Sequence, residues 1–169
     1  MIKYHEPVMV KEVLANLHIE KGGKYIDATL GTGGHALEII KDGGELLGIE
    51  ADPKMLAIAK KRLGAVSVPP SRWKVVLGNF VKVDEIAKEA SFAKVSGILF
   101  DLGVSNIHLT SDSRGFSFGN PEAKLDMRLN PEAQGVTAAD LLNVLREDQL
   151  EALFRVTLDS GSAKWLTQR

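Results

Sequence analysis

The sequence predicts an α/β fold in which a parallel β-sheet is covered by helices on both faces. Four short apolar segments, which we expect to be strands, alternate with segments of helical periodicity. The strand segments are almost continuously apolar, as is usual for strands that are buried on both faces. The first of them runs into the glycine-rich turn "DATLGTGGH", residues 27–35, which fits the loose form of the dinucleotide-binding fingerprint.

The first half of this pattern has clear boundaries. In order, we expect a helix over 7–17, a strand over 24–30, a helix over 35–41, a strand over 45–52 and a helix over 53–63. Asp52 followed by Pro53 is a natural helix start, because the aspartate can accept bonds from free backbone N–H groups and proline fits the first helical position.

The pattern continues to about Ser105 and then changes. We expect a strand over 73–80, a helix over 83–90 and a strand over 95–105 that ends near Asp101. The next 30 residues are polar and glycine-rich, longer than an ordinary connection, and loops of that length are usually functional or disordered. Helical patterns return at "TAADLLNVL", which Thr137 opens as a capping residue, and at "EDQLEALF", whereas the final 155–169 has no sustained period. The sequence therefore predicts a core over 1–105 and a different region over 106–169.

Composition excludes several classes of protein. The 169 residues suit one compact domain, and a net charge of -1 indicates neither a polyanion-binding surface nor a membrane-binding one. There are no cysteines, which excludes disulfides and thiolate metal sites, and the four scattered histidines lack metal-ligand spacing, so we expect no metal. The first residues do not resemble a secretory signal and no segment is apolar enough to span a membrane, so we expect a soluble, cytoplasmic protein.

The glycine turn predicts a ligand when it is read together with an acid on the next strand. Gly31, Gly33 and Ala36 fit the fingerprint, which alone is a weak signal and is compatible with a tight turn that binds nothing. Glu50 lies 19 residues after Gly31 at the end of the second strand, where a carboxylate can accept bonds from both ribose hydroxyls. The combination favours a ligand that contains adenosine.

Two further acids favour S-adenosylmethionine (SAM) over NAD. Asp27 ends the first strand and would repel a pyrophosphate, whereas the sulfonium and ammonium groups of SAM are attracted to carboxylates. Asp101 closes the fourth strand, and parallel sheets bind ligands at the carboxyl ends of their strands. Each acid alone could instead be a helix cap or a solvated strand end, but we expect Asp27, Glu50 and Asp101 to line one crevice.

Seven motifs occur in a specific order: "HEPVMVKEVL", "YIDATLGTGGHA", "GIEADP", "GNF", "GILFDLGVS", "RGFSF" and "LDMR". Together they resemble the ribosomal RNA small subunit methyltransferase H family, whose members use SAM to methylate the N4 atom of a cytidine in bacterial 16S ribosomal RNA. The last two motifs are the most distinctive, because generic methyltransferases lack them. The resemblance runs from His5 to about Phe154 and implies a Rossmann-like SAM-dependent methyltransferase fold.

The resemblance implies that the cofactor-binding residues are Gly33, Gly34, His35, Glu50, Phe80, Asp101 and His108. Glu50 stands where most members have aspartate, and Phe80 would stack on or flank the adenine, although it could equally be a core aromatic. Asp101 would lie near the methionine part of SAM and is our candidate catalytic residue, as the acceptor of a hydrogen bond from the target amine. His108 stands where the family usually has glutamine in a serine-proline-glutamine run.

The resemblance covers only about half of the family's usual length. It implies that 106–169 is a loop and part of the helical insert that follows the fourth strand, rather than an independent domain. The final residues depart from the family pattern. A SAM-dependent methyltransferase acting on 16S ribosomal RNA in the small subunit is thus our first hypothesis. A truncated, non-catalytic SAM-binding remnant and an NAD-dependent oxidoreductase are the alternatives.

Overall fold

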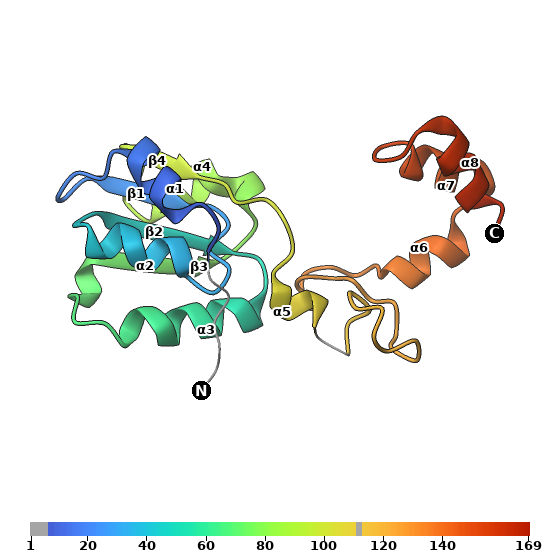
Figure 1. Ribbon diagram of the computed structural model, residues 1–169, viewed down its shortest axis with the longest axis horizontal. Coiled ribbons are helices and arrows are strands. Elements are labelled where there is room, and N and C mark those ends of the chain that lie inside the picture. Colours follow the sequence, from blue (N-terminus) through green and yellow to red (C-terminus); the bar gives the residue numbers. More distant parts are fainter. Residues whose placement is uncertain (1–6, 111–112) are drawn as a thin grey trace. The chain divides into compact units, whose positions relative to one another are not determined.

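The computed structural model describes residues 7–110 and 113–169, and the chain divides into two compact units, 1–107 and 108–169. The first unit contains α1 (Val10–Leu17), β1 (Lys24–Asp27), α2 (Gly34–Lys41), β2 (Glu45–Glu50), α3 (Pro53–Gly64), β3 (Trp73–Leu77), α4 (Val83–Glu89) and β4 (Gly97–Leu99), with short 3-10 turns at Pro70–Arg72 and Phe80–Lys82. The short helix α5 (Asn106–Leu109) lies at the boundary. The expected alternation of strands and helices is confirmed (Figure 1).

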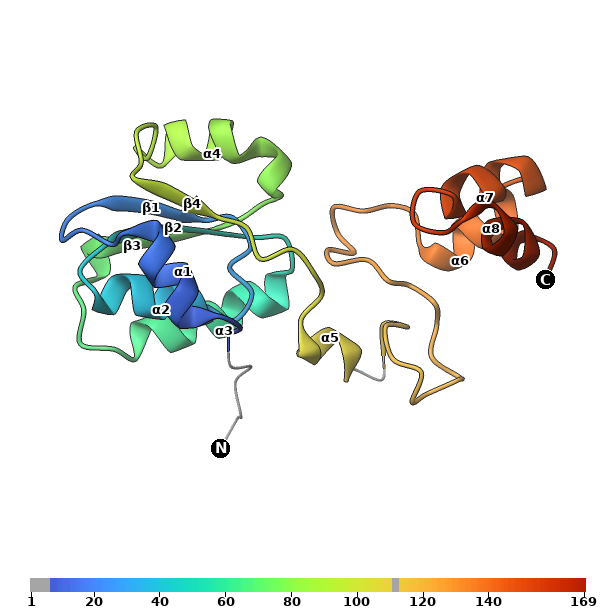
Figure 2. The same cartoon turned by 45° about the horizontal axis from the view of Figure 1, so that its top comes forward.

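The four strands form one parallel sheet in the order β3-β2-β1-β4. Helices α1, α2 and α3 lie on one face and α4 lies on the other (Figure 2). Side chains of neighbouring residues on β1 and β2 therefore enter different cores: Tyr25 and Leu46 pack with the helices of the first face, and Ile26 and Leu47 pack with α4. This arrangement confirms the predicted α/β Rossmann-like fold.

Several elements are shorter than their apolar segments. The first strand ends at Asp27 instead of Leu30, because the Asp27 carboxylate accepts a bond from the Thr29 N–H and the chain turns there. The fourth ends at Leu99, since the Asp101 N–H donates to the Thr29 hydroxyl rather than to a neighbouring strand. The helix expected from residue 7 begins at Val10.

Beyond α5, the described residues of the second unit form the helices α6 (Ala138–Val144), α7 (Glu147–Phe154) and α8 (Ser160–Thr167). The predicted threonine cap of α6 is confirmed, since the Thr137 side chain accepts a bond from the Asp140 N–H. Helix α8 was missed in a segment without sustained apolar period. Its signal is polar: the carboxylate of Asp159 accepts bonds from the N–H groups of Gly161 and Ser162 and so caps the helix.

Candidate functional site

Acidic residues gather at the carboxyl ends of three adjacent strands. Asp27 is the last residue of β1 and Glu50 the last of β2, while Asp101 follows β4 by two residues. Because β1 lies between β2 and β4 and all three run in one direction, their ends meet at the same edge of the sheet. That edge is where open parallel sheets place their ligands (Figure 1).

Asp27 is the most deeply buried of the three acids, with 1% of its surface exposed. Burial raises the pKa of its carboxyl to about 7, against a bond from the Thr29 N–H and the attraction of His35, which both lower it. The like charges of Glu50 and Asp101 raise the pKa further. A cation bound beside Asp27 would relieve this unfavourable environment.

Glu50 joins the second strand to the glycine turn. Its Oε2 accepts a bond of 2.6 Å from the Gly31 N–H, and its Oε1 accepts one of 2.8 Å from the Asp52 N–H. Burial raises the pKa of this carboxyl as well, while the backbone bonds oppose the shift. The Ala51 N–H also bonds to this carboxylate. Because a carboxylate has about four acceptor positions, the side chain can still accept a bond from a hydroxyl group.

The turn needs its glycines for different physical reasons. Gly31 and Gly33 have backbone φ angles of 53° and 78°, a left-handed conformation that residues other than glycine rarely adopt. Gly34 begins α2, and a Cβ there would lie 2.9 Å from Cγ of Pro7. Pro7 therefore packs directly on the turn.

His35 lies between Val8 and Asp101. Its Nε2 lies 2.8 Å from the Val8 carbonyl oxygen, which makes Nε2 the donor, and its Nδ1 lies 3.8 Å from Oδ2 of Asp101. His35 is buried at 7% exposure, whereas the Asp101 side chain is 47% exposed. The imidazole thus orients toward a carboxylate that a ligand can still reach.

Thr29 is a site residue that the sequence analysis missed. Its N–H donates to Asp27 over 3.2 Å, and its hydroxyl accepts a bond of 2.7 Å from the N–H of Asp101. It thereby ties together the ends of two strands whose residues are 72 positions apart. No local pattern announces such a contact, because it depends on the order of strands in the sheet.

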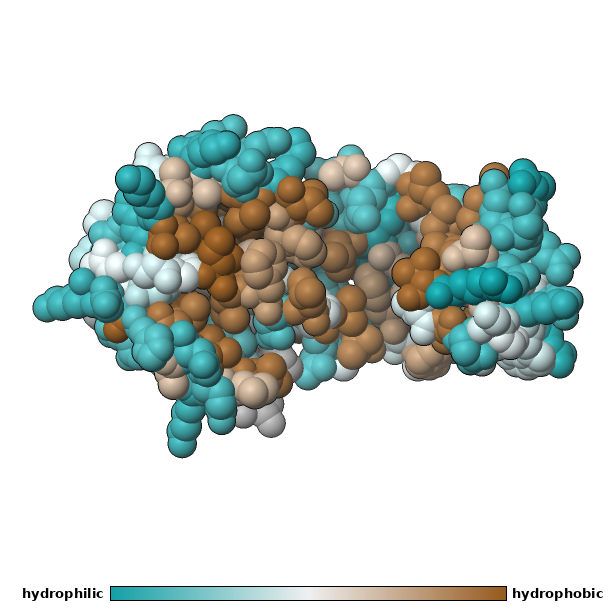
Figure 3. Space-filling view, turned by 90° about the horizontal axis from the view of Figure 1, so that it is seen from above, coloured by the Kyte–Doolittle hydropathy of each residue, from teal (hydrophilic) through white to brown (hydrophobic). Residues whose placement is uncertain are grey.

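Phe80 follows β3 and is 37% exposed. Its ring packs edge-on against Phe100, with 5.8 Å between the ring centroids and an angle of 89° between the planes. Phe100, Ile98 and Leu102 are exposed apolar residues as well. Seen from above, the molecule shows apolar side chains gathered on its surface (Figure 3). A contact between Phe80 and adenine stays a prediction.

His108 lies in the second unit and is 5% exposed. Its ring lies against that of Phe116, with 5.3 Å between centroids. This contact connects α5 with the "RGFSF" motif, so His108 has a packing role there. Its expected role in cofactor binding stays a prediction.

The two most distinctive motifs, residues 114–118 and 125–128, bind each other. The Met127 N–H donates to the Arg114 carbonyl oxygen, and a Cβ at Gly115 would lie 2.7 Å from the Lys124 carbonyl oxygen. Arg128 forms a bidentate ion pair with Asp126, with 2.6 Å from Nε to Oδ1 and 2.8 Å from Nη2 to Oδ2. This pairing lowers the pKa of the Asp126 carboxyl to about 2.

These contacts bury or engage some of the charged side chains of the loop. Arg114 is buried at 8% exposure, and Arg128 is also bonded to the Gln134 carbonyl oxygen. Phe118 is fully exposed and Lys124 is exposed. Of the aromatic and basic side chains of residues 114–128, these two are the exposed ones.

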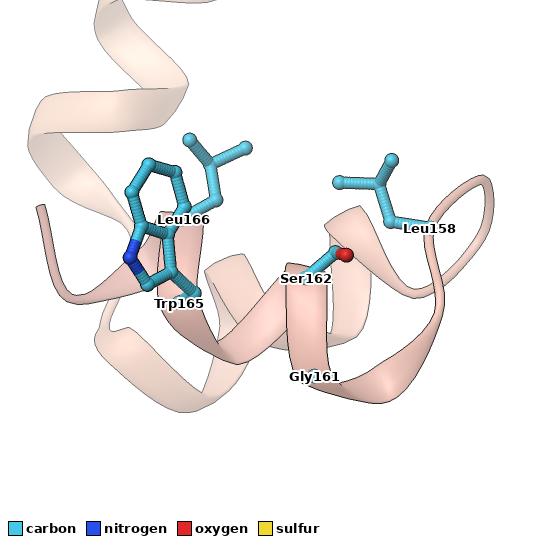
Figure 4. Close-up of a pocket in the computed structure, with 5 residues that line it drawn as sticks. All are labelled: Leu158, Gly161, Ser162, Trp165 and Leu166. Carbon is cyan, nitrogen blue, oxygen red and sulfur yellow. The ribbon is translucent and has the colours of Figure 1, made fainter.

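An open pocket of about 360 Å³ lies elsewhere, in the second unit (Figure 4). It is lined by Leu158, Gly161, Ser162, Trp165 and Leu166. The Leu158, Trp165 and Leu166 side chains border the hollow in Figure 4, and none of the lining residues is charged. The pocket has none of the acidic chemistry found at the sheet edge.

The described ranges 7–110 and 113–169 contain no group of three histidine or acidic side chains arranged to hold a metal ion. In the same ranges, no helix has both the length and the apolar character needed to cross a bilayer.

Curated relatives share much of this sequence. Ribosomal RNA small subunit methyltransferase H of Dictyoglomus thermophilum is 40% identical over 160 residues, which are 89% of this chain and 50% of the relative. The protein of the same name from Fusobacterium nucleatum is 44% identical over 153 residues, 89% of this chain and 47% of the relative. The chain therefore spans about half the length of the curated relatives it matches.

A solved structure, the TehB-like SAM-dependent methyltransferase of Corynebacterium glutamicum, is similar over 43% of this chain and 36% of its own, with 23% identity and a TM-score of 0.35. The family model described as the MraW methylase family matches residues 3–167, and so extends beyond Phe154, where we expected the resemblance to end. The chain belongs to the MraW methylase family.

Proposed function

We propose that this chain binds SAM and acts as a methyltransferase on the N4 atom of a cytidine in 16S ribosomal RNA of the small subunit. One observation carries the proposal: three acids from adjacent strand ends gather beside a glycine turn in a chain of the MraW methylase family. Relatives named ribosomal RNA small subunit methyltransferase H support the substrate. Such a substrate would be met in the cytoplasm.

The residues present fit SAM better than a pyrophosphate-containing cofactor. Asp27 is buried and has few bonds to stabilise its negative charge, so it favours a cationic ligand and disfavours an anionic one. Glu50 has free acceptor capacity for the ribose hydroxyls next to the turn that it holds. Phe80 would flank the adenine at the end of β3.

Asp101 is the candidate catalytic residue. When bound, SAM supplies an electrophilic methyl group on a sulfonium. The amine of cytosine is a poor nucleophile, and a carboxylate that accepts a bond from its N–H favours the pyramidal form that attacks. Asp101 is exposed enough to meet such an amine, and Thr29 and His35 limit where its backbone and carboxylate lie. Placement of the reacting atoms in line would contribute further.

The loop would supply the contacts to RNA. A base in structured RNA must leave its stack before a methyltransferase can reach it, and an exposed aromatic ring can hold it there. Phe118 and Lys124 are the outward-facing aromatic and basic groups of the two motifs.

Calorimetric titration with SAM and with NAD tests the cofactor. We expect binding of SAM alone, weakened at least tenfold by Glu50→Gln. Glu89→Gln is the matched control, because Glu89 is exposed at the end of α4. Binding of NAD in preference to SAM would favour the oxidoreductase reading instead.

Methyl transfer from labelled SAM to small ribosomal subunits that lack the modification tests the reaction. In a full-length relative, the substitution equivalent to Asp101→Asn should lower turnover more than a hundredfold. Asp84→Asn, at an exposed acid of α4 paired with Lys88, is the control and should have no effect. Binding of SAM by this chain without methyl transfer would support the alternative of a SAM-binding remnant.

A further inference from the structure

We propose that binding of SAM to this chain releases a proton from the buried carboxyl group of Asp27, so that the affinity for SAM rises with pH. The inference rests on the proposed function, because it concerns SAM at the same site. It adds a proton-linked regulation of binding that depends on one side chain.

The surroundings of Asp27 leave its negative charge poorly compensated. The side chain is 1% exposed, and its backbone hydrogen bond comes from the Thr29 N–H at 3.2 Å. The titratable groups that face it come from three other segments: His35 on α2, Glu50 at the end of β2 and Asp101 after β4. Two of these are acids, which oppose a further negative charge.

Burial and the two acids hold the carboxyl in its neutral form. They raise the pKa of Asp27 to about 7, so close to half of the molecules carry the proton at neutral pH when no ligand is bound. His35 lowers the pKa but does not balance burial. Asp27 is therefore poised to change charge when its neighbourhood changes.

A cationic ligand changes that neighbourhood in one direction. A positive charge within about 5 Å favours the ionised form of a carboxyl group. SAM has a sulfonium and an ammonium, and we expect both to lie at the strand ends beside Asp27. The proton leaves the carboxylic acid for the solvent, the carboxylate stays, and the bound cation compensates its charge.

The size of the effect follows from linkage. Below the pKa that Asp27 has in the chain without SAM, each rise of one pH unit should increase the affinity for SAM by up to about tenfold, because binding of one SAM releases one proton. Between pH 5.5 and 7.5 we expect a rise in affinity of about 20-fold. This range lies below the usual titration of an α-amino group, at about 7.7–8.0, so the ligand itself contributes little.

Calorimetry of the full chain measures the proton directly. SAM is titrated at pH 6 in several buffers of different ionisation enthalpy, and the dependence of the apparent heat on that enthalpy gives the number of protons released. We expect about 0.9 proton per SAM for the unsubstituted chain. Asp27→Asn, which keeps the shape of the neutral acid, should release no proton and show an affinity that does not change with pH. Asp84→Asn, at an exposed acid of α4, should behave like the parent chain.

Each other outcome is decisive. Binding of SAM without buffer dependence would overturn the proton release and leave the proposed function standing. Proton release that persists in Asp27→Asn would assign the proton to another group, such as His35, and would overturn the inference too. Absence of SAM binding in every buffer would overturn both proposals.

A second measurement avoids the risk that the Asp27→Asn chain does not fold. The carboxyl carbons of aspartate are labelled in the unsubstituted chain and followed by NMR against pH. One resonance should titrate near pH 7 in the free chain and move below pH 5 when SAM is present. If every aspartate titrates below pH 5 in the free chain, the inference is wrong.

Discussion

Different forces stabilise the two units of the chain internally. The first has two apolar cores, one on each face of the sheet, and its central strands contain side chains with no exposed surface. In the described part of the second unit, Ala163 is the one buried apolar residue. Burial of apolar surface is the main favourable term in folding, so the first unit should tolerate the loss of polar contacts better than the second.

The second unit depends instead on polar contacts between residues close in sequence. Arg128 binds Asp126, Thr137 and Asp140 bind each other at the start of α6, and Asp159 caps α8. Contacts of this kind fix local conformation but contribute little net stability near the surface. The comparison therefore predicts a rigid first unit and a second unit with lower local stability.

The largest test removes one leucine from each unit. Leu47 on β2 is fully buried, whereas Leu153 on α7 is 44% exposed. Leu47→Ala should lower the free energy of unfolding by about 3–5 kcal/mol, since it loses apolar contact and leaves a cavity. Leu153→Ala should cost less than about 1 kcal/mol. Urea unfolding of both variants measures the difference, and equal losses would contradict the comparison.

The second test uses pH. The pKa of Asp27 is raised to about 7 in the folded chain and is near 3.8 when unfolded, so the folded form binds the extra proton between these values. The first unit should therefore become more stable, by up to about 4 kcal/mol, as pH falls from about 7 to about 4. Asp27→Asn should remove most of this dependence.

Each unit contains one tryptophan, which allows the units to be followed separately. Trp73 packs against the core of the first unit, and Trp165 lies on α8 of the second. Thermal unfolding of Trp165→Phe chains, recorded by Trp73 fluorescence at several pH values, measures the first unit. A melting temperature that decreases as the pH is lowered from 7 to 4 would contradict the expected increase in stability.

The sequence predicted the first unit well because its signals are periodic and its acids end strands. Apolar runs located every strand, and "ADP" located the cap of α3 at Asp52. The exact strand ends were not predictable, because they depend on contacts such as Thr29 with Asp101 between distant segments. The placing of His35 against Val8 has the same origin.

In the second unit, polar capping patterns were more informative than apolar periodicity. Thr137 was identified as a cap, but Asp159 was not, and α8 was therefore missed. The mutual binding of Arg114 and Met127 has no local signal at all, since it joins two motifs across a loop. The resemblance indicated that both motifs matter without indicating that they bind each other.

A smaller effect should follow from loss of a helix cap. Thr137→Ala removes the side chain that accepts the Asp140 N–H, which should cost α6 about 1 kcal/mol. Hydrogen exchange of the α6 amides should become faster, while that of the β2 amides should not change. Thr137→Ser, which keeps the hydroxyl, should restore slow exchange. Faster exchange in both units would show that they are coupled more tightly than the comparison predicts.

The smallest effect should come from the ion pair of Asp126 and Arg128, which lies within the motif of residues 125–128. The pKa of Asp126 is lowered to about 2 by Arg128, so the pair stabilises the folded chain above pH 4 and is lost as pH falls from about 4 to about 2. Asp126→Asn should abolish this acid limb in unfolding curves recorded by Trp165 fluorescence of Trp73→Phe chains. Asp148→Asn is the matched control, because Asp148 also binds an arginine, Arg146, but both side chains are about 70% exposed. We expect the control to have no measurable effect, since exposed pairs are screened by solvent and salt. If both variants lose the same stability, the Asp126 pair is an ordinary surface contact and does not stabilise its motif more than an exposed pair would.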